Sequence, residues 1–219
     1  MCFAPRLNVH VKESKMHLLD QRILGIAILL LLGMLVTVKR ITTGSIFDKP
    51  KGNLMVQLVN IFNLFFLLVV NPIAAILLVT RRLATIDPTH IAINEPWILM
   101  FLEIVGLLKY VIGFLLMAWA LITLGRNYQL GGSAPRSEDK MVVNGPFRLV
   151  RHPMYTAALG ISFGLACLTQ SWAFFCVFCI YLVLIFLLVP LEEDGLRKAY
   201  GEPYVSYQQR TRKLIPLVY

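Results

Sequence analysis

Long apolar runs constrain the fold of this 219-residue chain more than any other feature. A bilayer offers no hydrogen-bond partners to backbone N–H and C=O groups, so an apolar segment of about 20 residues crosses it as a helix. Such runs are found at 23–38, 54–79, 97–124, 153–168 and 172–189. The sequence therefore predicts an all-α, polytopic membrane protein with about five transmembrane helices.

Features within these runs predict how the helices are shaped and connected. The second run contains Asn71-Pro72, and the proline removes one backbone donor, which predicts a kink. Only Thr169, Gln170 and Ser171 separate the last two runs, which predicts an antiparallel helical hairpin. No small-residue cleavage pattern follows the first run, so we expect it to remain as an anchor.

The charge distribution favours a membrane protein over a nucleic-acid-binding one. Charged residues make up 15% of the chain, and its net charge is +9. The Lys and Arg residues are dispersed among short loops beside the apolar runs, where they set topology and attract anionic lipid headgroups. Most lie on the side that holds the C-terminus, which predicts an outside N-terminus and a cytosolic C-terminus in a multi-pass protein. Both the plasma membrane and the endoplasmic reticulum fit this pattern.

Two charged clusters flank the predicted hairpin. Arg148, Arg151 and His152 precede Pro153, which suits the first position of a helix, and a helix start is a natural seat for an anion. Glu192 and Glu193 follow the other helix of the hairpin. Because the hairpin crosses the membrane and returns, we expect the two clusters to be neighbours. Either cluster alone is typical of any membrane-helix end or helix first turn, so the combination carries the functional interpretation.

An ordered set of motifs in the C-terminal part adds a resemblance. The set begins at Leu124-Gly125-Arg126-Asn127-Tyr128, continues through Gly145-Pro146-Phe147-Arg148-Leu149-Val150-Arg151-His152-Pro153-Met154-Tyr155, Glu192-Glu193 and Tyr200-Gly201-x-x-Tyr204-x-x-Tyr207, and ends with Leu214-Ile215-Pro216. It resembles the C-terminal signature of the isoprenylcysteine carboxyl methyltransferases and related phospholipid methyltransferases. The chain is thereby divided into an N-terminal membrane region, 1–124, with three predicted transmembrane helices, and a methyltransferase-like region, 125–219.

The resemblance implies a cofactor, a substrate class and a set of site residues. It implies S-adenosylmethionine in a cytosolic pocket and a lipid-linked or amphipathic acceptor that arrives from the bilayer through a gap between helices. The residues implied around the cofactor are Gly125, Asn127, Tyr128, Leu130, His152, Pro153, Tyr155 and Glu193. The catalytic candidates are Arg151, Glu192, Glu193, Arg212 and Lys213.

Charge complementarity suggests a role for each catalytic candidate. Glu192 and Glu193 would hold the donor's positive groups, and Arg151, Arg212 or Lys213 would position an anionic acceptor. The family has an arginine directly before the terminal Leu-Ile-Pro, whereas this chain has Lys213 there, so the identity of the acceptor-facing cation stays open. The tail segment 195–209 is expected to form an interfacial helix that acts as a lid.

Other functions and other polar residues remain open at this point. A phospholipid amine methyltransferase, an NADPH-dependent membrane sterol reductase with a similar Arg-His-Pro-x-Tyr segment, and a non-catalytic scaffold are the alternatives. Nothing in the sequence has the spacing of a metal site or a disulfide framework. Ionisable residues inside a span are functional candidates, so Lys109 either snorkels or lines a cavity, and Glu103 makes a poor direct partner for it. Gln57, Asn60 and Asn63 share a face of the second run, which favours contacts between helices over a ligand site.

Overall fold

The computed structural model describes residues 20–45, 54–128 and 139–214. The longer helices are α1 (Gln21–Thr43), α2 (Leu54–Phe65), α3 (Asn71–Val79), α5 (Pro96–Leu124), α6 (Pro153–Thr169), α7 (Trp172–Tyr200) and α8 (Glu202–Arg210). A π-helical segment, η1 (Phe66–Val70), joins α2 to α3, and the short elements are α4 (Leu83–Ile86), η2 (Gly125–Asn127) and η3 (Gly145–Arg148). No strand occurs in these ranges, which confirms the all-α prediction.

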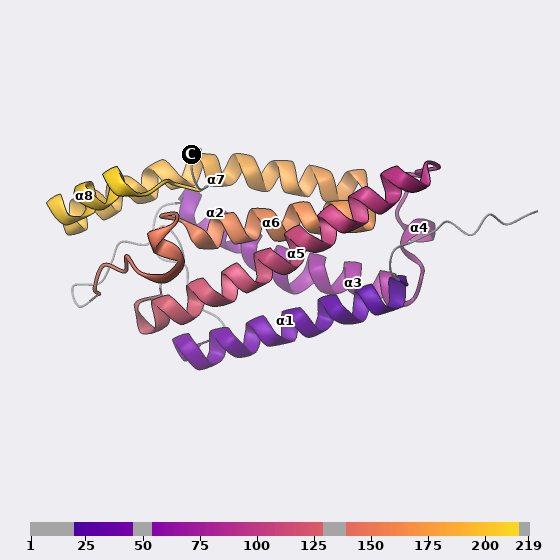
Figure 1. Cartoon of the computed structure of the whole chain (residues 1–219), viewed down its shortest axis with the longest axis horizontal. Coiled ribbons are helices and arrows are strands. Elements are labelled where there is room, and N and C mark those ends of the chain that lie inside the picture. Colours follow the sequence, from indigo (N-terminus) through magenta and orange to yellow (C-terminus); the bar gives the residue numbers. More distant parts are fainter. Residues whose placement is uncertain (1–19, 46–53, 129–138, 215–219) are drawn as a thin grey trace, which may run out of the picture.

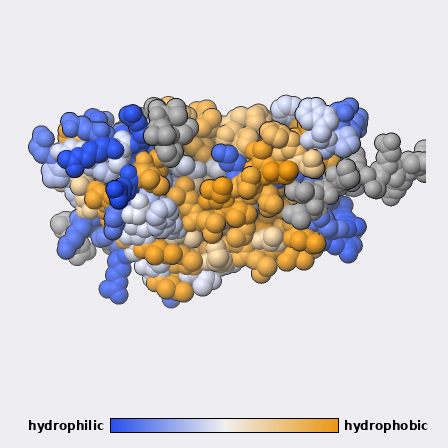
Figure 2. All heavy atoms as spheres, in the orientation of Figure 1, coloured by the Kyte–Doolittle hydropathy of each residue, from blue (hydrophilic) through white to orange (hydrophobic). Residues whose placement is uncertain are grey.

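The helices run back and forth along the long axis of the molecule (Figure 1). Four helical segments in the described residues are long and apolar enough to span a bilayer: 21–43, 54–79, 96–127 and 172–200. Helix α6 is also apolar but has only 17 residues. Figure 2 shows a broad hydrophobic band between two hydrophilic ends. The chain is therefore a polytopic membrane protein in which four long spans accompany one shorter helix.

Helix α6 lies against α5 and α7 at the centre of the bundle, and most of its residues are buried. Glycines allow the close approach of α5 and α6. A Cβ atom on Gly164 would lie 2.7 Å from both the carbonyl oxygen of Gly106 and the backbone nitrogen of Tyr110. Small residues at such crossings let helix backbones pack closely inside a membrane. The short α6 is thus held mainly by its helical neighbours.

The proline in the second span is accommodated by a π-helical segment. Pro72 follows η1, and the buried side chain of Asn71 donates from Nδ2 to the carbonyl oxygen of Phe66 at 2.9 Å. Tyr110 of α5 donates its hydroxyl to Oδ1 of Asn71 at 2.8 Å. The side-chain amide therefore satisfies a backbone acceptor beside the proline, which is how a helix inside a bilayer tolerates this residue.

Helix α7 extends further than the sequence predicts. The predicted end was residue 189, but Pro190 lies inside α7, which continues to Tyr200. The predicted tail helix, 195–209, is wrong for the same reason: its first residues belong to α7, and α8 begins only after Gly201, whose φ of 62° ends α7. Buried Val189 and Glu193 lie on either side of Pro190, so packing maintains the helix at a residue that usually interrupts one.

The turn between α6 and α7 confirms the predicted hairpin. Gln170, in the left-handed conformation, ends α6 and is followed by Ser171, the N-cap of α7. Residues after α4 hold this turn: the backbone nitrogen of Ile91 donates to the carbonyl oxygen of Gln170 at 2.7 Å, and that of Trp172 donates to Thr89 at 3.1 Å. The division of the chain at residue 124 stays a prediction, because helices from both parts contribute to one core.

Candidate active site

The tail after α8 pairs with the segment before α6. The backbone nitrogen of Arg151 donates to the carbonyl oxygen of Arg212 at 2.7 Å, and that of His152 donates to Lys213 at 3.0 Å. The hydroxyl of Thr156 donates to the carbonyl oxygen of Leu214 at 2.6 Å. The backbone donors of Arg151 and His152 are therefore occupied by the tail. The expectation that the start of α6 binds an anion stays a prediction.

The two ends of the hairpin meet in a buried ion pair. Nε of Arg151 lies 2.7 Å from Oε1 of Glu193, and the two side chains are only 7% and 4% exposed. The same guanidinium donates to the carbonyl oxygens of Gln208 and Thr211 in the tail. Nε2 of His152 lies 3.4 Å from the same Glu193 oxygen. The predicted proximity of the basic and acidic clusters is confirmed, and the pair also fixes the tail.

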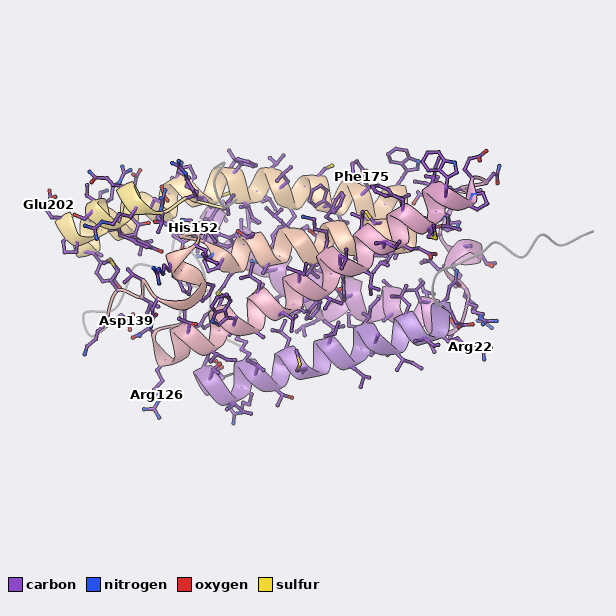
Figure 3. The ribbon with its side chains drawn as sticks, in the orientation of Figure 1. Arg22, Arg126, Asp139, His152, Phe175 and Glu202 are labelled. Atoms are coloured by element: carbon purple, nitrogen blue, oxygen red, sulfur yellow. The ribbon has the colours of Figure 1, made fainter. Side chains whose placement is uncertain are left out.

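A cavity of about 310 Å³ opens beside this ion pair. At its polar end lie His152, Tyr155, Glu192 and Tyr204. Nδ1 of His152 lies 3.7 Å from Oε2 of Glu192, and its ring stacks on that of Tyr155 with centroids 5.7 Å apart. Figure 3 shows His152 at the same end of the bundle as Asp139 and Glu202, with Arg22 at the opposite end.

Several polar atoms at this end have no hydrogen-bond partner among the described residues although they are buried. They are the hydroxyls of Tyr155 and Tyr204 and Oε2 of Glu192. Buried polar atoms without partners cost free energy, so a set of them around a cavity indicates a ligand with complementary polar groups. One carboxylate and two hydroxyls suit a ligand that carries a positive charge and hydrogen-bonding groups.

The other end of the cavity is apolar and lies among the helices. Its walls come from Leu35 and Val36 of α1, Leu67 of η1, and Met117 and Leu121 of α5. A small polar group interrupts this surface, where Tyr181 of α7 donates its hydroxyl to Oδ1 of Asn63. Asn63 therefore contacts another helix, as predicted. The cavity as a whole is amphipathic.

Tyr207 connects α8 to the segment before α6. Its hydroxyl donates to the carbonyl oxygen of Phe147 at 2.5 Å. Burial raises the pKa of Tyr207 to about 12, so this phenol stays protonated and keeps its donor throughout the physiological range. Helix α8 thus covers the polar end of the cavity through a contact that does not titrate near neutral pH.

The predicted site residues divide into two groups. Those that line the cavity are Asn127, Tyr128, Arg151, His152, Pro153, Tyr155 and Glu192. Those that do not line it are Gly125, Glu193, Arg212 and Lys213. Leu130 lies outside the described residues. The cavity also includes Lys39, Asn60 and Asn63, which the sequence did not identify as site residues because the first three spans carry no motif.

The span residues Glu103 and Lys109 lie away from this cavity. Lys109 is exposed near the middle of α5, which favours snorkelling over lining a cavity. Glu103 is buried and lines a small separate pocket with His90 and Gln170. Neither residue therefore contributes to the polar end of the site.

Fold and sequence define the class of protein to which this chain is similar. Residues 101–203 match the phospholipid methyltransferase family. The chain has the fold of the eukaryotic intramembrane Ras methyltransferase ICMT (isoprenylcysteine carboxyl methyltransferase), with a TM-score of 0.52, 17% identity, and coverage of 88% of this chain and 85% of that one.

Curated relatives point the same way. The chain is 31% identical over 125 residues to protein-S-isoprenylcysteine O-methyltransferase B of Arabidopsis thaliana, covering 52% of this chain and 58% of the relative. It is 27% identical over 128 residues to a probable protein-S-isoprenylcysteine O-methyltransferase of Oryza sativa subsp. japonica, covering 58% and 65%. It is also 27% identical over 138 residues to the cobalt-zinc-cadmium resistance protein CzcN of Cupriavidus metallidurans, covering 63% and 60%. The chain thus spans less than two thirds of these relatives, and its resemblance to membrane methyltransferases of the ICMT kind is confirmed.

Proposed function

We propose that this chain is an integral membrane methyltransferase that transfers a methyl group from S-adenosylmethionine to the carboxylate of a lipid-linked or amphipathic acceptor. The observation that carries the proposal is the amphipathic cavity. Its polar end offers a carboxylate and two hydroxyls that make no hydrogen bond with the described residues, and its apolar end lies among helices that span the membrane. One cavity can therefore hold a polar, positively charged donor and an apolar acceptor tail together.

The polar groups fit the donor. S-adenosylmethionine carries positive charge on its sulfonium and amino groups, and its ribose carries hydroxyls. Glu192 lines the cavity with a buried oxygen that accepts no hydrogen bond from the described residues and lies 3.7 Å from Nδ1 of His152. Glu193, in contrast, is held by Arg151 at 2.7 Å. We therefore assign Glu192 to the donor's positive groups, and Tyr155 and Tyr204 to its polar atoms. Glu193 positions Arg151 and the tail.

The chemistry requires alignment more than proton transfer. When bound, the cofactor supplies a methyl group on a positively charged sulfur. An acceptor carboxylate would take the methyl group in a C–O bond while the electron pair of the broken C–S bond would stay on sulfur, so the chain would need no general base. The chain has to align the two reactants and exclude water, which α8 and the buried tail contacts do at the polar end. We expect this end to lie in the cytosol, because most Lys and Arg residues lie on the side that holds the C-terminus.

A phospholipid amine is the second candidate acceptor, because residues 101–203 match the phospholipid methyltransferase family. An amine must lose a proton before it attacks, whereas a carboxylate need not. Incubating membranes with radiolabelled S-adenosylmethionine and extracting them separates the two: label in a base-labile ester supports the carboxylate, and label in phospholipid headgroups supports the amine.

The donor assignment is tested by binding to the full chain in detergent micelles. We expect saturable binding of S-adenosylmethionine, and Glu192→Gln should weaken it about tenfold, since one charge-assisted contact is lost. Asp194→Asn is the matched control, because Asp194 is the next acid in α7 but is exposed. Saturable NADPH binding with no response to S-adenosylmethionine would reject methyl transfer and support a reductase. An equal effect of both variants would reject the role of Glu192.

A further inference from the structure

The cavity contains a cation that comes from the first helix of the bundle. Among the described residues, the lysines and arginines that line it are Lys39, Lys140 and Arg151. Arg151 is committed to Glu193 and to two carbonyl oxygens of the tail. Arg212 and Lys213 contribute their backbone carbonyls to the pairing before α6 and do not line the cavity. Of these three described cations, Lys39 and Lys140 are therefore the candidates for meeting an acceptor anion.

Lys39 is the better placed of the two. It is half-buried, whereas Lys140 is exposed. Its Nζ lies 5.3 Å from the ring centroid of Tyr128, another cavity residue that packs against the main core. A cation–π contact stabilises an ammonium without neutralising it. The contact thus fixes the position of a positive charge at the cavity wall.

The register of α1 relates this charge to the apolar end of the cavity. Leu35 and Val36 line the cavity and precede Lys39 by four and three residues, so the three side chains share one face of α1. The face changes from apolar to cationic toward the end of α1 that lies at the same end of the bundle as His152 (Figure 3). A ligand with its tail along Leu35 and Val36 would place its head at Lys39.

We infer that Lys39 binds the anionic head of the acceptor, so that α1 selects amphiphiles that end in a carboxylate. This inference rests on the proposed function and adds a specificity-determining residue to it. Glu192 then faces the cationic donor and Lys39 faces the anionic acceptor, while Asp139 is a second acid on the cavity wall. The lysine also explains why the position before the terminal Leu-Ile-Pro need not supply the acceptor-facing cation in this chain.

The test compares two probes that differ only in the head group. N-acetyl-S-farnesylcysteine carries a carboxylate beside its prenyl tail, and its carboxamide is the neutral counterpart. Binding of each probe to the full chain in nanodiscs is measured without donor, so the result does not depend on methyl transfer. Lys39→Met should weaken binding of the acid about tenfold and leave the amide unchanged, because a single charge-assisted contact is removed. Lys39→Arg should restore most of the affinity for the acid.

Two variants serve as controls. Arg40→Met removes the neighbouring positive charge of α1, which is exposed and does not line the cavity, and it should change neither affinity. Lys140→Met removes the second candidate cation. The inference is overturned if the wild-type chain does not discriminate the acid from the amide, if Lys39→Met weakens both probes equally, or if Lys140→Met alone causes the selective loss. Failure of S-adenosylmethionine to bind the wild-type chain would instead reject the proposed function and leave this measurement intact.

Discussion

Replacing Arg151 by methionine should destabilise the protein strongly. The substitution leaves the carboxylate of Glu193 buried without its main partner and removes the donor to the tail carbonyls of Gln208 and Thr211. Breaking a buried ion pair on one side costs about 3–5 kcal/mol, because the remaining charge stays desolvated. His152, 3.4 Å from the same oxygen, can offset part of this loss. We therefore expect a loss of about 3 kcal/mol.

The measurement is the free energy of unfolding from circular dichroism during titration of detergent-solubilised protein with sodium dodecyl sulfate. Arg197→Met is the control, since the contacts of Arg197 with Asp194 at 3.6 Å and with Oε1 of Gln208 at 2.8 Å are exposed. Exposed ion pairs contribute about 0–1 kcal/mol. The double variant Arg151→Met with Glu193→Leu should recover much of the loss, because no charge then remains buried. Equal effects of Arg151→Met and Arg197→Met, or no recovery in the double variant, would refute this reasoning.

Two further predictions concern the helix crossings, and the same unfolding measurement checks both. Gly164→Ala should lower the free energy of unfolding by about 1–3 kcal/mol, because the added methyl group meets the backbone of α5. Gly33→Ala is the control: no atom lies within 4 Å of its Cβ position, so the change should be neutral or slightly stabilising. Equal effects of the two variants would show that α5 and α6 do not cross as described. Tyr110→Phe should cost about 1–3 kcal/mol, because Oδ1 of buried Asn71 loses its donor. A change in the free energy of unfolding below about 0.5 kcal/mol would show that the hydrogen bond between Tyr110 and Asn71 does not stabilise the protein.

The sequence predicted the long helices well because an apolar run of about 20 residues is enough to identify a membrane span. Its errors arose where tertiary packing overrides a local signal. Pro190 ordinarily ends a helix, but the packing around Val189 and Glu193 carries α7 past it. The Asn71-Pro72 pair predicted a kink. The sequence of this span alone does not predict the π-helical segment before Pro72 or the hydrogen bond from Tyr110 of α5.

The order of the spans predicts those parts of the site that lie at the two ends of one hairpin. It does not predict contacts between helices that are distant in the sequence. A hairpin that returns to its starting side brings Glu193 to His152, so their proximity followed from the order of the spans. The hydrogen bond from Arg151 to the tail depends on how α8 packs against the segment before α6, and no local sequence pattern predicts that packing. Lys39 was missed because an isolated lysine at the end of a span is typical of topology control.

The position of α6 has a consequence for biogenesis. A helix of 17 residues covers about 25 Å, less than the roughly 30 Å hydrocarbon layer of a bilayer, and its buried surface meets protein and not lipid. If each helix were inserted into the bilayer separately, such a short helix would partition into lipid only weakly. We therefore expect α6 to enter the membrane as one unit with α7, and the tight Gln170–Ser171 turn gives that unit its shape before α5 is packed against it.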